Sequence, residues 1–421
     1  MILLLPILTR LYTPEDFSVL AVYAAIVGIA SVAAGLRLEI AIPLPVEERS
    51  AVNLLALALC SSALVSAALA TLVLLYPSQA SSLLSQPKLL PYLWLLPVGV
   101  WLISSYAALQ YWATRKKRFE QIARTRFTQA LGGGASQVIL GYLGLAPLGL
   151  LLGHLISSGA GVVTLGRALL KRDDCEIREI SGPGMKQVFL EYKRFPKYST
   201  LDALANTAGV QLPLVIIAAM AVGPEAGFLM LAMRSMQAPI GLVGGAVAQV
   251  YLSRAAEEAR AGRLATFTAK TMSGLLKTGV GPILFVGCIA PTVFPKLFGD
   301  EWVRAGQIAT WMTPWLAFQF VASPISMVMH VRSRQQAMLA LTISGLLLRL
   351  GAIAIAAEVA SARLSEYYAL ASAAYYLVCL FVFARAAEVT WRSLLLVATR
   401  SLPWLAGWLG AAGVVTVMLA K

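Results

Sequence analysis

The sequence is short of charge and of cysteine, and both shortages narrow the class of protein. Only 13% of its 421 residues are charged and 59% are hydrophobic, whereas soluble globular domains carry about 25% charged residues. This composition excludes an ordinary water-soluble domain. The four cysteines show no Cys-x-x-Cys spacing, which excludes a zinc ribbon or a dense disulfide framework. We interpret them as reduced packing residues.

The motifs of nucleotide-driven and metal-dependent enzymes are missing as well. No Gly-x-x-x-x-Gly-Lys-Ser/Thr loop occurs, and no polar stretch is long enough to fold into a separate catalytic domain. The two histidines, His154 and His330, are solitary, and we interpret them as packing residues. We therefore expect no catalytic residues, no metal site and no cofactor, while coupling to an ion of unknown identity stays open.

Long apolar segments recur along the whole chain. Each is about 20 residues long, which is enough to cross roughly 30 Å of hydrocarbon as a helix. They predict an all-α integral membrane protein with twelve full spans, at about 17–36, 51–75, 92–113, 128–146, 147–167, 200–222, 226–250, 272–293, 305–330, 337–357, 366–387 and 403–420. The preceding piece, 1–8, makes only about 12 Å of helix and is too short to span.

The distribution of Lys and Arg predicts the orientation. When the loops are assigned alternately to the two sides, 25 of the 34 basic residues fall on one side and six on the other. The remaining three, Arg234, Lys277 and Arg349, lie inside apolar spans. Because cytoplasmic loops carry the excess of basic residues, the rich side is predicted to be cytoplasmic. The orientation of the loops therefore explains most of the net charge of +14, and we expect no nucleic-acid partner.

The longest cytoplasmic loop, 168–199, carries an amphipathic pattern. Met185, Val188 and Tyr192 recur at helical spacing opposite charged residues, which predicts a helix lying at the membrane surface. Gly182 and Pro183 break the chain before it. The pattern predicts an amphipathic linker with a hinge near the middle of the sequence.

An internal repeat divides the chain. Pro97 is followed eighteen residues later by Arg115, and Pro314 is followed at the same spacing by Arg332, an offset of 217. Six spans in each half give both halves the same orientation, as in a parallel repeat. The predicted organisation is an N-terminal lobe at 1–167, a linker at 168–199, a C-terminal lobe at 200–388 and an extra span within 389–421. The repeat also leads us to expect a first span that lacks about a dozen residues.

Several stretches together resemble a known family. They are LLLPILTRLYTPEDFSVLAVYAAIVGIASVAAGLRLEIAIPLP, EYKRFPKYSTLDALANTAGVQLPLVI and GPEAGFLMLAMRSMQAPIGLVGGAVAQVY. In these stretches the chain resembles the polysaccharide (O-antigen type) flippases of the multidrug/oligosaccharidyl-lipid/polysaccharide (MOP) exporter superfamily. The resemblance implies two six-helix lobes around a central cavity that opens alternately to each side. The sequence departs from the family pattern in its short first span and at Ser18, where glycine is expected.

The resemblance also implies a substrate, a location and partners. The substrate would be an undecaprenyl-diphosphate-linked oligosaccharide repeat unit of O-antigen, lipopolysaccharide or exopolysaccharide, moved from the cytoplasmic to the periplasmic leaflet. The location would be the inner membrane of a bacterium. Membrane lipids, a polysaccharide polymerase and chain-length machinery would be the partners.

Charges within spans are the candidate binding residues, because a charge at mid-span costs roughly 2.5–3.5 kcal/mol to insert. Arg234 and Arg349 lie deep in their spans, and no acidic residue lies near a span centre. This sign bias predicts an anionic ligand such as a diphosphate, which the guanidinium fork binds well. Lys277 and Arg37 complete the predicted cationic cavity. Lys277 could instead reach the headgroups, and Arg37 could form a surface pair with Glu39.

Neutral polar residues within spans are candidates for sugar contacts. Asn206, Gln211, Gln249 and Gln319 can hydrogen-bond sugar hydroxyls, or hold helices together instead. The lack of a mid-span carboxylate argues against a cation-coupled drug antiporter. A multidrug or other lipid-intermediate exporter of the same fold remains an alternative.

A membrane polymerase or glycosyltransferase is the alternative from a different class. Such an enzyme needs catalytic acids gathered at the membrane face. Here Glu15, Glu225, Glu358 and Glu366 are scattered over short outer loops, which favours a transporter over an enzyme.

Overall fold

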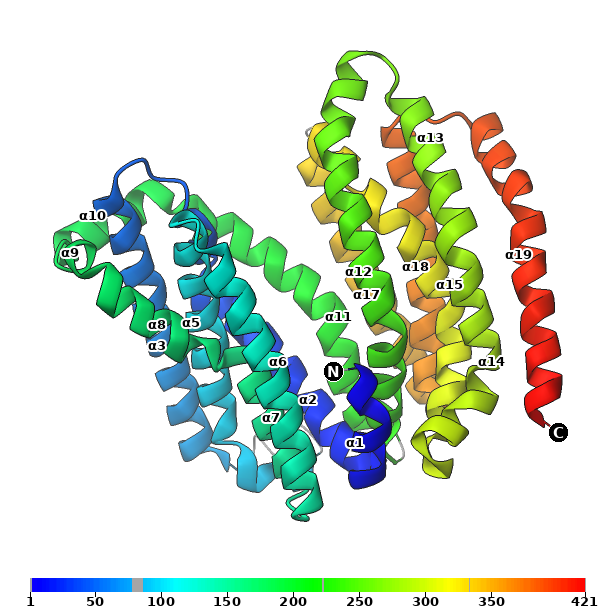
Figure 1. Ribbon diagram of the computed structural model, residues 1–421, viewed down its shortest axis with the longest axis horizontal. Coiled ribbons are helices and arrows are strands. Elements are labelled where there is room, and N and C mark those ends of the chain that lie inside the picture. Colours follow the sequence, from blue (N-terminus) through cyan, green and yellow to red (C-terminus); the bar gives the residue numbers. More distant parts are fainter. Residues whose placement is uncertain (1, 78–85, 222, 333, 421) are drawn as a thin grey trace. The chain divides into compact units, whose positions relative to one another are not determined.

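The computed structural model describes residues 2–77, 86–221, 223–332 and 334–420, and within these ranges the chain forms helices and no strand. The chain divides into two compact units (Figure 1). The first unit holds residues 11–219, and the second holds residues 2–10 together with 220–421. The predicted all-α class is confirmed.

The first unit begins with a well-capped helix. Thr13 accepts a hydrogen bond from the Asp16 backbone while the Asp16 carboxylate accepts one from the Thr13 backbone, and Pro14 occupies the first turn. Its helices are α2 (Pro14–Gly35), η2 (Leu38–Ala41), α3 (Glu48–Leu75), η3 (Pro87–Tyr92), α5 (Leu95–Arg115), α6 (Phe119–Tyr142), α7 (Leu148–Gly159), α8 (Gly161–Arg172), α9 (Asp174–Ile177), α10 (Gly182–Tyr192), η4 (Phe195–Ser199) and α11 (Thr200–Met220).

The predicted linker is fixed to the first unit. The buried Asn53 side chain donates to the carbonyl of Glu179 at 3.2 Å and accepts from the backbone N–H of Ser181 at 3.0 Å. Ser181 in turn caps α10 by accepting from the Gly184 backbone. The predicted amphipathic helix is present as α10, but the break at Gly182 begins this capped helix. It is therefore not a free hinge, since both sides of the break are hydrogen-bonded.

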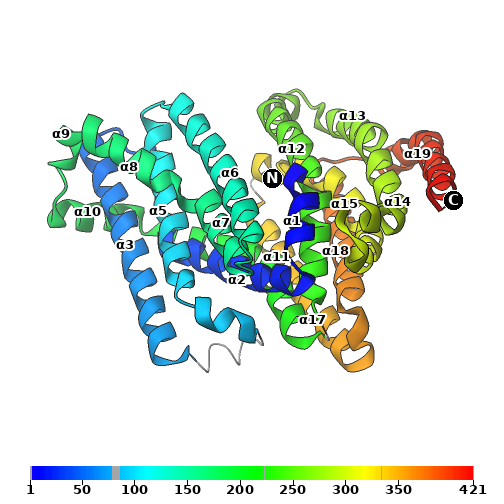
Figure 2. The same ribbon diagram turned by 60° about the horizontal axis from the view of Figure 1, so that its bottom comes forward.

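The second unit is built around α15. This helix packs against α18, α14 and α12, and Figure 2 shows α19 at the edge of the unit beside α14. The elements are η1 (Ile2–Leu4), α1 (Leu5–Leu11), α12 (Glu225–Arg260), α13 (Leu264–Leu275), η5 (Leu276–Val280), α14 (Gly281–Phe298), η6 (Asp300–Trp302), α15 (Val303–Ile325), α16 (Val328–Val331), α17 (Gln335–Val359), η7 (Ser361–Arg363), α18 (Leu364–Ala386) and α19 (Trp391–Ala420).

Nine helices of the described residues are long and apolar enough to cross a membrane. They coincide with nine of the twelve predicted spans. The other three predicted spans are also helical, as the less apolar α5, α6 and α12. The helices α12 and α13 run past the predicted span ends and form a hairpin in which the Tyr251 hydroxyl lies 2.7 Å from that of Thr268 (Figure 1).

The units do not follow the predicted lobe boundaries. The division falls after Ala219, about twenty residues later than expected, because α11 keeps its contacts with the first unit. There Gln211 lies against Gly28 of α2, and Gln86 donates to the carbonyl of Ala218. Residues 2–10, expected in the N-terminal lobe, group with the second unit, where the Trp302 indole donates to the Thr9 carbonyl at 3.2 Å.

Ion pairs join the helix ends of the second unit. Arg304, in the first turn of α15, reaches Glu225 at 2.8 Å and Glu366 at 2.7 Å. These acids begin α12 and α18, and both carboxylates are buried. The scattered outer-loop acids of the sequence are thus partly gathered around one guanidinium.

Candidate functional site

Arg349 is buried between α17 and α18. Its Nε donates to the Ser372 hydroxyl at 3.1 Å, and its guanidinium carbon lies 4.4 Å from the centre of the Tyr375 ring. Gly345, one turn earlier on α17, makes room for this ring, since a Cβ there would lie 2.3 Å from Tyr375. Hydrogen bonding and cation–π contact therefore hold this charge within the second unit.

Arg234 has different surroundings. It lies on α12 and is half-buried. Within the described part of the chain it forms no hydrogen bond and no ion pair. An arginine in a membrane-spanning segment normally faces a wet interior or a partner. Arg234 is thus a guanidinium of the predicted cavity that has no polar partner among the described residues.

Lys277 lies on a longer helix than predicted. The sequence suggests a position one turn from the cytoplasmic end of a span starting at 272. The continuous helix starts at Leu264, which places Lys277 about 20 Å along it. Lys277 belongs to η5, a π-helical turn, and its side chain is exposed. Insertions of this kind are frequent at functional sites.

Arg37 and Glu39 are neighbours at the end of α2. The Arg37 Nη1 lies 3.6 Å from Glu39 Oε1. This is an ion pair, as the sequence allowed, but Glu39 is only 7% exposed, so it is not a surface pair.

The four neutral candidates are dispersed. Asn206 on α11 and Gln249 on α12 are exposed, whereas Gln211 is half-buried against Gly28. Gln319 is half-buried on α15, and its Oε1 is buried without a hydrogen-bond partner among the described residues. Gln319 is therefore the neutral candidate with an unused buried acceptor, and the side-chain packing of Gln211 fits the helix-packing interpretation.

Aromatic residues around Arg349 were not predicted. Trp315, one turn before Gln319, packs edge-on against Tyr368 with ring centres 5.3 Å apart. Tyr368 lies one turn before Ser372, and Tyr376 lies 5.6 Å from the Arg349 guanidinium. The spacing of the tyrosines and Ser372 in 368–376 puts them on one helical face, and that spacing is the signal that could have indicated the cluster.

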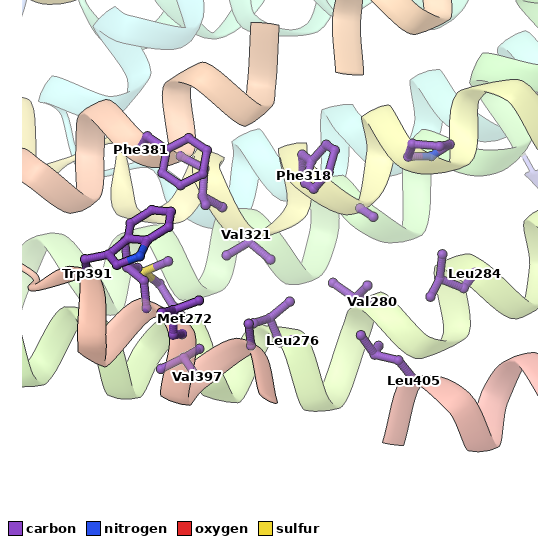
Figure 3. Close-up of a pocket in the computed structure, with 16 residues that line it drawn as sticks. Met272, Leu276, Val280, Leu284, Phe318, Val321, Phe381, Trp391, Val397 and Leu405 are labelled. Atoms are coloured by element: carbon purple, nitrogen blue, oxygen red, sulfur yellow. The ribbon is translucent and has the colours of Figure 1, made fainter. Parts of the chain in front are cut away.

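A separate apolar cavity of about 440 Å³ lies beneath α19 (Figure 3). Its lining residues come from α13, η5, α14, α15, α18 and α19, and they include Leu276, Phe318, Phe381 and Trp391. It contains none of the predicted cationic or sugar-binding residues. Its chemistry suits a hydrocarbon chain rather than a sugar or a phosphate.

Charged residues also tie the predicted linker to the end of α5. Arg118 forms two hydrogen bonds with Asp173, and the Trp112 indole donates to the same carboxylate at 2.9 Å. Burial opposes ionisation of Asp173, but these donors outweigh it, so the pKa of Asp173 lies below its ordinary value. Lys116 binds Glu48 at 3.1 Å and Glu176 at 2.7 Å. These pairs fix the linker and leave little charge for a ligand.

The arrangement of helices defines a class. The chain is a multi-pass integral membrane protein, and its fold is that of solved MOP-superfamily transport proteins. Residues 7–307 match the family described as polysaccharide biosynthesis protein, and the chain belongs to that family. The family resemblance read from the sequence is confirmed.

Two solved structures share the fold. One is the lipid II flippase MurJ in an inward closed conformation, with a TM-score of 0.67, 13% identity and coverage of 98% of this chain and 96% of that one. The other is an inward-facing multidrug resistance MATE family transporter of the MOP superfamily, with a TM-score of 0.64, 16% identity and coverage of 92% and 97%. No curated protein matches the sequence.

Proposed function

We propose that this protein is a flippase of a bacterial inner membrane that moves undecaprenyl-diphosphate-linked oligosaccharide repeat units from the cytoplasmic to the periplasmic leaflet. The polysaccharide biosynthesis family, together with a fold shared with a lipid II flippase, supports a lipid-linked substrate. The O-antigen or exopolysaccharide class follows from the resemblance of the sequence. A polymerase and chain-length machinery would receive the product.

Arg234 is the observation that carries the proposal. It is a half-buried guanidinium in a membrane-spanning helix with no hydrogen bond or ion pair in the described part of the chain. An anionic ligand would compensate its charge, and a diphosphate offers oxygens for a bidentate contact. Lys277, which is exposed and lies in the middle of the helical stretch that begins at Leu264, would add attraction for the same anion.

Arg349 has a supporting role in this proposal. Its contacts with Ser372 and Tyr375 fix α17 against α18. In this proposal Arg349 keeps these contacts and attracts the anionic substrate electrostatically, without binding it directly. The unused carbonyl of Gln319 and the half-buried Tyr376 are suited to sugar hydroxyls and sugar ring faces.

The apolar cavity beneath α19 supports the lipid part of the substrate. An isoprenoid chain needs apolar surface at membrane depth, and the cavity is lined by aliphatic and aromatic side chains from six helical elements.

Complementation of a flippase-deficient strain tests the proposal, with surface polysaccharide as the readout and membrane abundance matched. Loss of the charge-assisted contact in Arg234→Ala should weaken binding by about 1.5–3 kcal/mol, roughly tenfold to a hundredfold. Arg234→Lys should restore function only in part, because lysine lacks the planar fork. Arg254→Ala, an exposed position on the same helix, is the matched control. Full activity of Arg234→Ala would refute the assignment.

A further inference from the structure

The turn after α2 brings together two opposite charges that are poorly satisfied. Leu36 and Arg37 both adopt the left-handed backbone region, with φ of 49° and 55°, which is uncommon for residues with side chains. The chain therefore folds back, and the Glu39 carboxylate lies over Gly35. A Cβ at Gly35 would come 2.8 Å from Glu39 Oε2 and 3.2 Å from the Ser104 hydroxyl. Glycine is what leaves space for the carboxylate.

Each member of the pair has a buried polar atom that makes no hydrogen bond within the described part of the chain. Glu39 Oε2 and Arg37 Nε are both buried without a hydrogen-bond partner among the described residues. At 3.6 Å, the contact between them is longer than a charge-assisted hydrogen bond of about 2.7–2.9 Å. Arg37 keeps a third of its side chain exposed. Arg37 is thus partly accessible, and Glu39 Oε2 has no hydrogen-bond partner among the described residues.

Apart from Arg49, which is exposed in the first turn of α3, the other charged groups on the packed elements are engaged elsewhere. The turn containing Glu39 packs against α3, α5 and η4. The field that acts on Glu39 comes from Arg37. On α3, Glu48 is held by Arg115 and Lys116, and on η4 the Lys197 ammonium lies over the Tyr198 ring.

We propose that Arg37 and Glu39 form an exchangeable pair in which the guanidinium turns to a diphosphate anion while the Glu39 carboxyl takes up one proton from the cytoplasmic side. The inference rests on the proposed function and assigns an anion contact and a proton site to the same turn. The diphosphate replaces Glu39 as the counter-ion of Arg37. The proton neutralises the carboxylate that is left behind, since an isolated buried charge is costly.

Burial and pairing act on Glu39 in opposite directions. Burial raises the pKa of the Glu39 carboxyl above its ordinary value, while its own backbone and Arg37 lower it by less. When the anion takes over Arg37, the lowering effect of the guanidinium is removed and the pKa rises further. Proton uptake is therefore expected in the pH range between the two pKa values.

Calorimetric titration of the purified full chain in detergent measures this uptake. Heats of binding in two buffers of different ionisation enthalpy, between pH 5 and 8, give the number of protons taken up per ligand. Farnesyl diphosphate and inorganic pyrophosphate are the anionic probes, and farnesol is the uncharged control. Per ligand bound, wild type should take up more protons than Glu39→Gln, and the difference should reach about one proton. Glu47→Gln, an exposed acid of the same loop, should behave like wild type.

The variants separate the possible failures. Arg37→Gln should bind the diphosphates about tenfold more weakly, the effect of one charge-assisted contact, and should lose the extra uptake even if Glu39→Gln fails to fold. Equal uptake by wild type and Glu39→Gln at every pH, or uptake with farnesol, overturns the inference alone. Absence of any diphosphate binding by wild type overturns the proposed function as well.

Discussion

Two arginines of the same apparent kind have different surroundings. Arg234 and Arg349 are both basic residues within apolar spans, and by sequence they are equivalent candidates. In the structure Arg349 is held by Ser372 and Tyr375, whereas Arg234 has no polar partner among the described residues. One residue therefore contributes to stability and the other is available for binding.

Replacing each arginine by glutamine should separate the two roles. Arg349→Gln loses a charge-assisted hydrogen bond and a cation–π contact, which together stabilise the fold by roughly 2–4 kcal/mol. The midpoint of thermal denaturation in detergent should fall clearly. Arg234→Gln should leave the midpoint unchanged and lower transport. The assignment fails if Arg234→Gln is the less stable variant.

Asp173 makes the linker anchor dependent on pH. Since its pKa is lowered from 3.8, its ionised form stabilises the fold above that value, and this contribution is lost as the pH falls through the lowered pKa. Asp173→Asn should therefore reduce stability at pH 7 by about 1.5–3 kcal/mol. The difference from wild type should shrink below pH 3.8. Thermal denaturation across pH 3–7 measures it, and Asp174→Asn, whose pair with Arg178 is exposed, should change little.

At the scale of elements, short polar contacts decide which helix ends stay together. The carboxylates of Glu225 and Glu366 begin different helices and meet at Arg304 of a third. Asn53 similarly holds the linker to α3 through Glu179 and Ser181. These contacts do not extend the apolar surface. They fix the angles and registers between elements whose packing is otherwise non-directional.

Arg304→Ala should be among the most destabilising changes in the second unit. It leaves two buried carboxylates without a counter-ion, which costs about 3–5 kcal/mol. Arg304→Ala combined with Glu225→Gln and Glu366→Gln should recover much of the loss, because no unpaired charge remains. Expression level and thermal denaturation report the effect. Arg263→Ala, which breaks the exposed pair with Glu258, is the control and should cost less than about 1 kcal/mol.

At the scale of the whole molecule, topology follows from loop charge. The basic side of the chain should face the cytoplasm. Native Cys175 lies exposed in the predicted cytoplasmic linker, and Asp300 is exposed in a predicted periplasmic loop. Both positions are suited to labelling with a membrane-impermeant maleimide.

A variant that keeps only Cys175 should react with this reagent after permeabilisation of the inner membrane and not before. The Asp300→Cys variant that lacks all four native cysteines should react in intact spheroplasts. Replacement of Cys60, Cys288 and Cys379 by alanine gives the first background. Labelling of Cys175 from outside would reverse the orientation.

The sequence by itself determined the membrane class, the helical fold and the family. Hydropathy and loop charge are averages over windows of about twenty residues. The predictions made from them therefore hold even when a helix boundary lies several residues from its predicted position. The predicted spans accordingly appear as helices, although α12 and α13 run further than expected. The motif stretches likewise needed no contacts to indicate the family.

Tertiary structure alone decided the surroundings of the individual charges. The sequence shows that Glu39 follows Arg37, but only the left-handed turn and the packing against α3 and α5 bury its carboxylate. The sequence also does not show that Arg349 contacts Tyr375, or that Glu225 and Glu366, 141 residues apart, share Arg304. The physical reason is that an ion pair acts over a few ångströms and depends on which helix faces meet, whereas insertion into the membrane depends on each segment alone.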